Sequence, residues 1–129
     1  MGKLFLSMSL FLMILNLIIP VAYAESVDIE LHDVGCMENG EVRIRYGLIN
    51  NKRFDENNVI LGFQIIVDDK PVACKELKVN VPKGSDGSDV MELFIQASCK
   101  PNSFEVKYIS IAYPYKRYVI DKWFSGCPK

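Results

Sequence analysis

The sequence predicts an all-β protein, and within that class an antiparallel β-sandwich of about seven strands. The clearest observation is the stretch 59–81, in which two runs with an apolar residue at every second position flank the polar turn Asp68–Pro71. Period-two spacing places such residues on one face of a strand, and a short loop with Asp and Pro between two strands is typical of a β-hairpin. Shorter runs of this kind recur between turn signals, and no segment sustains helical spacing.

The first 24 residues have the pattern of a cleaved secretory signal peptide. Lys3 is their only charge, a long apolar run follows it, and Ala22–Ala24 supplies the small-x-small pattern of a cleavage site. An uncleaved membrane anchor is the alternative, because about 20 apolar residues can span a bilayer. We expect a signal peptide over 1–24, a single β-sandwich domain over 25–129, and a secreted or periplasmic location.

The charge balance excludes some classes of partner. The chain has 15 Lys and Arg against 16 Asp and Glu, a formal net charge of −1. This balance gives no electrostatic reason to bind nucleic acid or an anionic membrane surface. We therefore expect no nucleic-acid partner and, after cleavage of the leader, no membrane span.

The first two strands are predicted over 27–32 and 41–48, where apolar and polar residues alternate. Asn39-Gly40 lies between them and is the strongest short signal for a hairpin turn. The polar segment 50–58 that follows the second strand is predicted to be an exposed loop.

Strands three and four are the arms of the central hairpin, 59–67 and 72–81. Ile60 and Ile66 place apolar side chains on the second face of strand three as well. A strand that is apolar on both faces is covered on both, so we expect strand three to be central. The Gly- and Ser-rich segment 82–89 is then a flexible loop by composition.

Strands five, six and seven are predicted over 90–97, 104–113 and 117–124. Two turns, each containing a proline, separate them. The apolar alternation in strand six changes phase at Tyr108–Ile109, which predicts a β-bulge there.

Three pieces of the run 42–111 form a recognisable pattern: a strand ending in Asn, a hairpin with apolar residues ahead of Asp and Lys, and a Gly-containing loop. They are Leu48-Ile49-Asn50, Ile65-Ile66-Val67-Asp68-Asp69-Lys70-Pro71-Val72, and Pro82-Lys83-Gly84. This pattern resembles the bacterial immunoglobulin-like and CARDB-type adhesion modules. The resemblance implies a fold, the immunoglobulin-like antiparallel β-sandwich, and implies nothing about activity.

The four cysteines predict two disulfides, because an even number behind an export signal favours pairing. A metal site is disfavoured, since no two cysteines have C-x-x-C spacing and His32 stands apart. Consecutive antiparallel strands run in opposite directions, so each strand ends at the opposite end of the sandwich from the one before it. Counting these reversals along the chain places all four cysteines at one end. In an immunoglobulin-like arrangement the first and last strands lie side by side and strand four lies near strand five. We therefore predict Cys36–Cys127 and Cys74–Cys99, although three connectivities remain open from sequence alone.

The residues that suggest catalysis or metal binding have simpler interpretations. His32, the only histidine, is expected to be a solvated surface residue on the polar face of strand one. Asp86 and Asp89 lie in a Gly-rich loop but lack the ligand ladder and closing Glu of a calcium loop. Asp68 and Asp69 occupy a convex hairpin tip, where turn formation explains them better than a catalytic carboxylate pair. We therefore predict no enzyme, no metal and no cofactor.

The aromatic turn is the stretch most suggestive of recognition. Tyr113, Tyr115, Lys116 and Arg117 combine rings and cations at a turn, and Tyr and Arg are favoured at the centres of interfaces. The alternative is that these rings cover the core, because aromatic residues are also strong strand formers.

From these observations we expect a small exported, non-catalytic binding or structural module of the cell envelope or extracellular space. It would engage a protein or glycan through loops 51–58, 82–89 and 113–117, which the strand count places opposite the disulfides. The alternative is a secreted inhibitor or effector that blocks an enzyme, with Tyr115 or Lys116 as the inserted residue.

Overall fold

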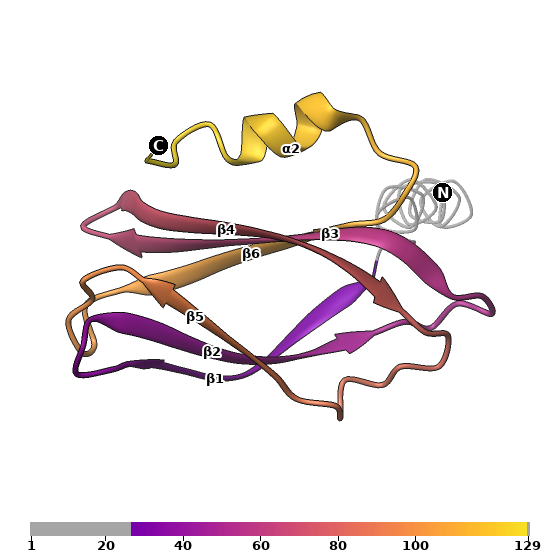
Figure 1. Ribbon diagram of the computed structural model, residues 1–129, viewed down its shortest axis with the longest axis horizontal. Coiled ribbons are helices and arrows are strands. Elements are labelled where there is room, and N and C mark those ends of the chain that lie inside the picture. Colours follow the sequence, from indigo (N-terminus) through magenta and orange to yellow (C-terminus); the bar gives the residue numbers. More distant parts are fainter. Residues whose placement is uncertain (1–26, 129) are drawn as a thin grey trace, which may run out of the picture.

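The computed structural model describes residues 27–128, so the predicted signal peptide lies outside the described part of the chain. Two antiparallel sheets face each other, and a short helix covers the outer side of the second sheet (Figure 1). The predicted all-β sandwich with two disulfides is confirmed. Within residues 27–128, no helix is both long and apolar enough to cross a membrane.

Each sheet has three strands within the described residues. The first has the order β1-β2-β5, with bounds Asp28–Cys36, Glu41–Ile49 and Met91–Gln96. The second has the order β4-β3-β6, with bounds Lys70–Val81, Glu56–Val67 and Glu105–Ile111. Helix α2, Arg117–Trp123, follows β6.

The antiparallel order sorts the connections to opposite ends of the sandwich. The β1–β2 and β3–β4 hairpins and the link from β5 to β6 lie at one end, on the left in Figure 1. The loops 50–55, 82–90 and 112–116 lie at the other end. We call this second end the loop end. The count of strand reversals predicted that these three loops would lie together there.

The core lies between the inner faces of β2 and β3, where every second residue is apolar. It includes Val42, Ile44, Tyr46 and Leu48 of β2 and Val59, Leu61, Phe63 and Ile65 of β3. The Tyr46 and Phe63 rings meet with centroids 5.2 Å apart, and burial raises the pKa of the Tyr46 hydroxyl. Ile60 and Ile66 are buried on the other face of β3, which confirms that this strand is central and covered on both sides.

The prediction of a strand over 117–124 is wrong, because this segment forms α2 and a following turn. Ile120 is 1% exposed, and Trp123 and Phe124 follow it at helical spacing. A Cβ atom on Gly62 would lie 2.7 Å from the Trp123 ring and 2.9 Å from the Phe124 ring, so a glycine in β3 makes room for the helix. The described residues therefore hold six strands, and the immunoglobulin-like classification stays a prediction.

The bulge predicted at Tyr108–Ile109 is also wrong, since β6 pairs with β3 without a register shift. The apolar phase changes there because β6 is covered on both faces: Val106 packs on the core, whereas Ile109 approaches Gly62 beneath α2. Register shifts occur instead in β1, between Leu31 and Asp33, and in the β3–β4 pairing, between Glu56 and Val59 and between Ile65 and Ile66.

The disulfides are Cys36–Cys99 and Cys74–Cys127, so the predicted pairing, Cys36–Cys127 and Cys74–Cys99, is wrong. β1 and β5 flank β2 in one sheet, and this brings the ends that carry Cys36 and Cys99 together. Cys99 packs on the core, whereas Cys74 pairs in register with Gln64, whose side chain contacts the helix. Cys74 therefore faces the segment after α2 and bonds to Cys127.

The close approach of two glycines gives a first test of the fold. A Cβ atom on Gly47 would overlap the carbonyl oxygen of Gly87 and lie 2.7 Å from its carbonyl carbon. Because this obstacle is backbone, we expect Gly47→Ala to lower the free energy of unfolding by about 3 kcal/mol, as overpacking does. Urea denaturation measures the effect.

Gly35→Ala is the matched control, since nothing lies within 4 Å of a Cβ atom there. We expect this change in β1 to alter stability by less than about 1 kcal/mol. Equal losses in the two variants would contradict the packing of the 82–90 loop against β2.

Candidate functional site

The register in which the strands pair brings the three loops of the loop end together. Glu56 at the start of β3 is paired with Val81 at the end of β4, and Ile60 is paired with Ile111 at the end of β6. The chain segments on either side of these pairs are therefore held together. All three loops predicted to bind a partner meet at this end of the sandwich (Figure 1).

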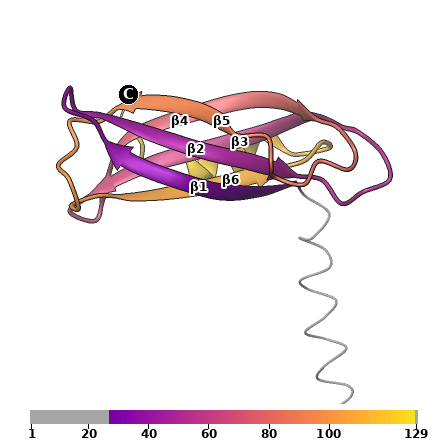
Figure 2. The same cartoon turned by 90° about the horizontal axis from the view of Figure 1, so that it is seen from below.

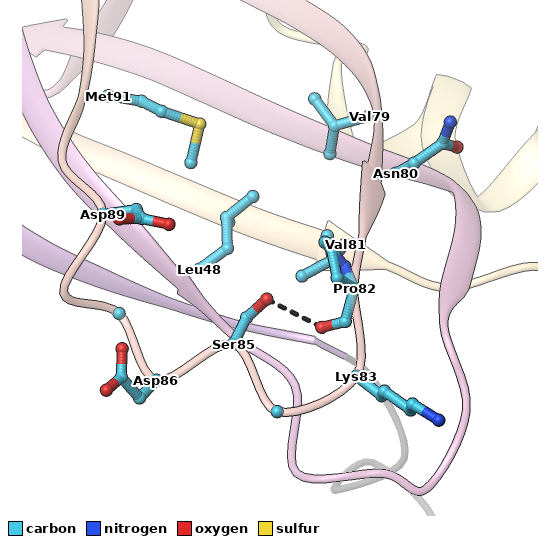
Figure 3. Close-up of a pocket in the computed structure, with 12 residues that line it drawn as sticks. Leu48, Val79, Asn80, Val81, Pro82, Lys83, Ser85, Asp86, Asp89 and Met91 are labelled. Atoms are coloured by element: carbon cyan, nitrogen blue, oxygen red, sulfur yellow. Dashed lines mark hydrogen bonds between the residues drawn. The ribbon is translucent and has the colours of Figure 1, made fainter.

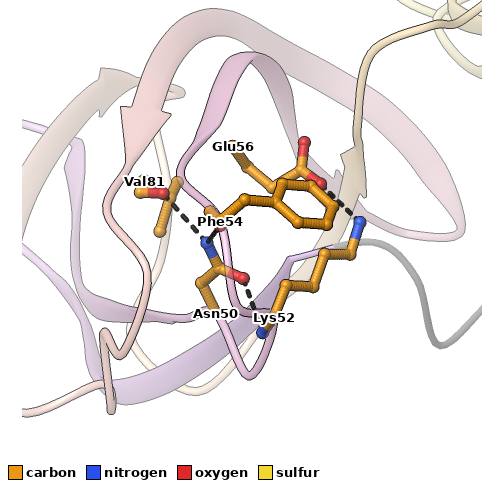
Figure 4. A network of polar contacts seen from close by, with 5 residues as sticks. All are labelled: Asn50, Lys52, Phe54, Glu56 and Val81. Atoms are coloured by element: carbon orange, nitrogen blue, oxygen red, sulfur yellow. Dashed lines mark hydrogen bonds and ion pairs between the residues drawn. The ribbon is translucent and has the colours of Figure 1, made fainter.

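Asn50 ties two of these loops together (Figure 4). Its side chain is 1% exposed, and Nδ2 donates hydrogen bonds to the carbonyl oxygens of Phe54, at 3.1 Å, and Val81, at 3.0 Å. Its Oδ1 accepts from the backbone N–H of Lys52 at 3.0 Å. Its own backbone bonds to Ser85 and Gly84. One buried amide thus fixes both loop 50–55 and the start of loop 82–90.

Phe54 is held outward at the tip of the first loop. Its ring is 58% exposed, and the Lys52 ammonium lies 5.4 Å from the ring centroid. Lys52 also forms an ion pair with Glu56, which is buried. An exposed ring on a hydrogen-bonded loop is a suitable contact residue, because little conformational entropy is lost when it binds.

A pocket of about 630 Å³ opens beside the second loop (Figure 3). Its floor is apolar, and polar side chains stand around the opening. The floor residues are Leu48, Val79, Val81 and Met91, and the polar residues are Asn80, Lys83, Ser85, Asp86 and Asp89. An apolar floor with a few polar groups is the usual composition of a ligand site.

The wall of this pocket is ordered by local hydrogen bonds. Ser88 donates its N–H and its hydroxyl to Asp86, and these bonds hold the pKa of Asp86 below its usual value. The Nε2 atom of His32 lies 2.8 Å from the carbonyl oxygen of Gly87 and is placed to donate to it. His32 is exposed, as expected, and this contact also ties its ring to the loop.

The calcium interpretation of Asp86 and Asp89, which the sequence already disfavours, gains no support from the geometry. Asp86 uses Oδ1 to close its own turn with Ser88. Among residues 27–128, no group of three or more His, Cys, Asp or Glu side chains is arranged to hold a metal ion.

The four predicted binding residues divide into two groups. Tyr113 is 62% exposed and meets the half-buried Tyr115 edge-on, with ring centroids 5.9 Å apart. Lys116 is exposed beside the ring of Tyr118, at 5.9 Å from its centroid. Tyr118, 64% exposed, belongs to the same aromatic stretch but was not among the four predicted binding residues.

Arg117, in contrast, is engaged within the molecule. Its Nη1 and Nη2 atoms lie 3.0 and 2.8 Å from the two oxygens of Glu76, and its Nε lies 3.0 Å from Asp121. These hydrogen bonds, with that to Glu76 the largest cause, raise the pKa of the guanidinium further above its usual value. Arg117 therefore docks the start of α2 on β4.

No family profile, no curated protein and no solved structure matches this chain. The function must accordingly be inferred from the loop end itself.

Proposed function

We propose that this protein is an exported, non-catalytic binding module that engages a protein or glycan through its loop end. Two disulfides suit an oxidising compartment outside the cytoplasm. The observation that carries the proposal is the pocket at the loop end, with an apolar floor and a polar opening, beside which the buried Asn50 amide ties loop 50–55 to Val81 of the pocket floor.

Exposed aromatic rings on the neighbouring loops support the same surface. Phe54 lies on loop 50–55 and Tyr113 on loop 112–116, and each ring is more than half exposed. Large rings on fixed backbones bind with little entropic cost, and aromatic residues dominate the energetics of interfaces. The surface therefore combines two exposed anchors with a pocket that can receive a partner side chain or a sugar.

The alternative proposal, a secreted inhibitor or effector that blocks an enzyme, uses the same end of the molecule. Lys116, exposed beside Tyr118, is the residue suited to enter an active-site cleft. The two proposals differ in the partner, and one experiment distinguishes them.

The experiment compares the wild type with Phe54→Ala/Tyr113→Ala in quantitative capture from native envelope extracts and on a glycan array. We expect the affinity for the captured partner to fall by at least about tenfold, the effect of removing an aromatic anchor. If the partner is an enzyme that the wild type inhibits and the variant does not, the inhibitor proposal holds.

Phe94→Ala is the control, because Phe94 is also an exposed ring, 47% accessible, but lies on β5 near the hairpin end. We expect no loss of binding in this variant. A double variant that retains every partner of the wild type would refute the loop end as the binding surface.

A further inference from the structure

Arg53 is the charged side chain of loop 50–55 that is free to contact a partner. It is exposed, and no ion pair joins its guanidinium to another residue in the described part of the chain. The Lys52 ammonium is instead paired with Glu56, and the Asp55 carboxylate accepts a backbone N–H of the next loop. Of the three loops at the loop end, this one reaches furthest beyond the strands (Figure 2).

Several contacts join the two sides of the peptide bond between Arg53 and Phe54. The buried Asn50 side chain holds both sides, because its Oδ1 accepts the N–H of Lys52 and its Nδ2 donates to the carbonyl oxygen of Phe54 (Figure 4). The Lys52 ammonium reaches across the same bond to the Glu56 carboxylate and to the Phe54 ring. The backbone on each side of this bond is therefore fixed to the other side by side chains.

The Cys36–Cys99 disulfide also spans this bond in sequence. A cut after Arg53 divides the described chain into 27–53 and 54–128, and the disulfide joins the two parts. Strand β2, in the first part, also stays paired with β5 of the second part. Cleavage would therefore release neither part, and the two new chain ends would stay close together.

We propose that loop 50–55 is an inhibitory loop, in which Arg53 enters the specificity pocket of a serine protease that cleaves after arginine. Such a pocket has a carboxylate at its base, which pairs with the guanidinium. Arg53 suits the pocket better than Lys52, because the Lys52 ammonium is already paired with the buried Glu56. This role rests on the proposed binding function of the loop end, in its inhibitor form, and places the inserted residue at Arg53 instead of Lys116.

The contacts across the bond explain why this loop inhibits a protease that could otherwise cut it. The protease serine attacks the carbonyl carbon of Arg53 and forms an ester, and the serine proton passes to the Phe54 nitrogen, which leaves as an amine. Because Asn50 and Lys52 hold Phe54 in place, this amine stays beside the ester. It attacks the ester, re-forms the peptide bond and returns the proton to the serine faster than water hydrolyses the ester.

The test measures inhibition of trypsin, whose specificity pocket contains a carboxylate, with a small chromogenic substrate. We expect the wild type to inhibit trypsin and to leave chymotrypsin, whose pocket is apolar, active. Arg53→Ala should weaken the inhibition at least about 100-fold, as the loss of an anchoring arginine does. Arg53→Lys keeps the positive charge and should stay within about tenfold of the wild type. Lys116→Ala is the control, because Lys116 is also an exposed cation at the loop end, and it should inhibit normally.

A second variant tests the contacts across the bond. Lys52→Met/Glu56→Gln removes the ion pair without leaving either charge unpaired, and Arg53 remains in place. We expect trypsin to hydrolyse the Arg53–Phe54 bond of this variant at least about tenfold faster than that of the wild type, because the new amine is held less firmly. Mass spectrometry of the reduced protein measures the fraction cut.

Five results would overturn this role of Arg53. Three are no inhibition of trypsin by the wild type, equal inhibition by Arg53→Ala, and equal inhibition of chymotrypsin. The fourth is hydrolysis of the wild type as fast as that of the double variant. The fifth is loss of inhibition in Lys116→Ala alone, which would leave the inhibitor function standing at another residue. If trypsin is not inhibited but Phe54→Ala/Tyr113→Ala still loses its captured partner, the loop end stands as a binding surface without this role.

Discussion

Replacing Asn50 by Asp should lower the free energy of unfolding by about 4 kcal/mol, the cost of an uncompensated buried charge. The Nδ2 atom of Asn50 lies 3.1 and 3.0 Å from two carbonyl oxygens. A carboxylate oxygen in its place would face both carbonyls without a proton to share, in a site that is 1% exposed. Urea denaturation at neutral pH measures the loss.

The same variant should recover stability as the pH falls. Burial against two acceptors raises the pKa of the introduced carboxyl in the folded protein above its unfolded value. The folded state then binds the proton more tightly, so the penalty is present above the folded pKa and shrinks as the pH falls through it. A penalty that does not change with pH would contradict this explanation.

Asn80→Asp is the matched control for the Asn50 variant. Asn80 is exposed and uses only Oδ1, as the acceptor of the Asn58 N–H at 3.1 Å. Aspartate retains that acceptor, so the change in stability should stay within about 0.5 kcal/mol. Comparable losses at Asn50 and Asn80 would show that Asn50 is not the junction of the two loops.

Removing the bridge between Cys74 and Cys127 with alanine at both positions should lower the free energy of unfolding by about 4 kcal/mol. The estimate follows from loop entropy, since the two cysteines are 53 residues apart in sequence. The bridge also holds α2 on the second sheet. We therefore expect faster amide exchange in α2 and stronger quenching of Trp123, the single tryptophan, by acrylamide under native conditions.

Alanine at Cys36 and Cys99 is the control, because those residues are 63 apart. Loop entropy then predicts a loss that differs by only about 0.2 kcal/mol. Trp123 should stay protected in this variant, because the bridge that is removed, Cys36–Cys99, lies in the first sheet. Helix α2 then keeps its contacts with Gln64 and Gly62 in the second sheet. Equal quenching of Trp123 in the two variants would refute the local role of Cys74–Cys127.

The aromatic turn shows how far sequence reasoning about a site can reach. Tyr113 and Lys116 are exposed at the loop end, as their composition and position suggested. Arg117 is held by Glu76, a residue 41 positions away, and no local pattern signals that contact. The Asn50 junction was missed for the same reason, since a lone Asn at the end of a strand usually indicates a turn.

The helix α2 carried a local signal that was available in the sequence. Arg117 and Asp121 are four residues apart and form an ion pair, and Ile120, Trp123 and Phe124 have the spacing of a helical face. Alternating apolar residues in the same short segment also fit a strand. Burial against Gly62 decides between the two, and that contact joins residues far apart in sequence.

The sequence by itself determined the all-β class, the two hairpins and the central position of β3. Each of these depends on period-two apolar spacing and on turn residues, which act over a few neighbouring positions. Only the tertiary structure decided the partner of each cysteine and the helix in place of a last strand. Those features depend on which surfaces meet across the sandwich, and packing between distant segments selects them.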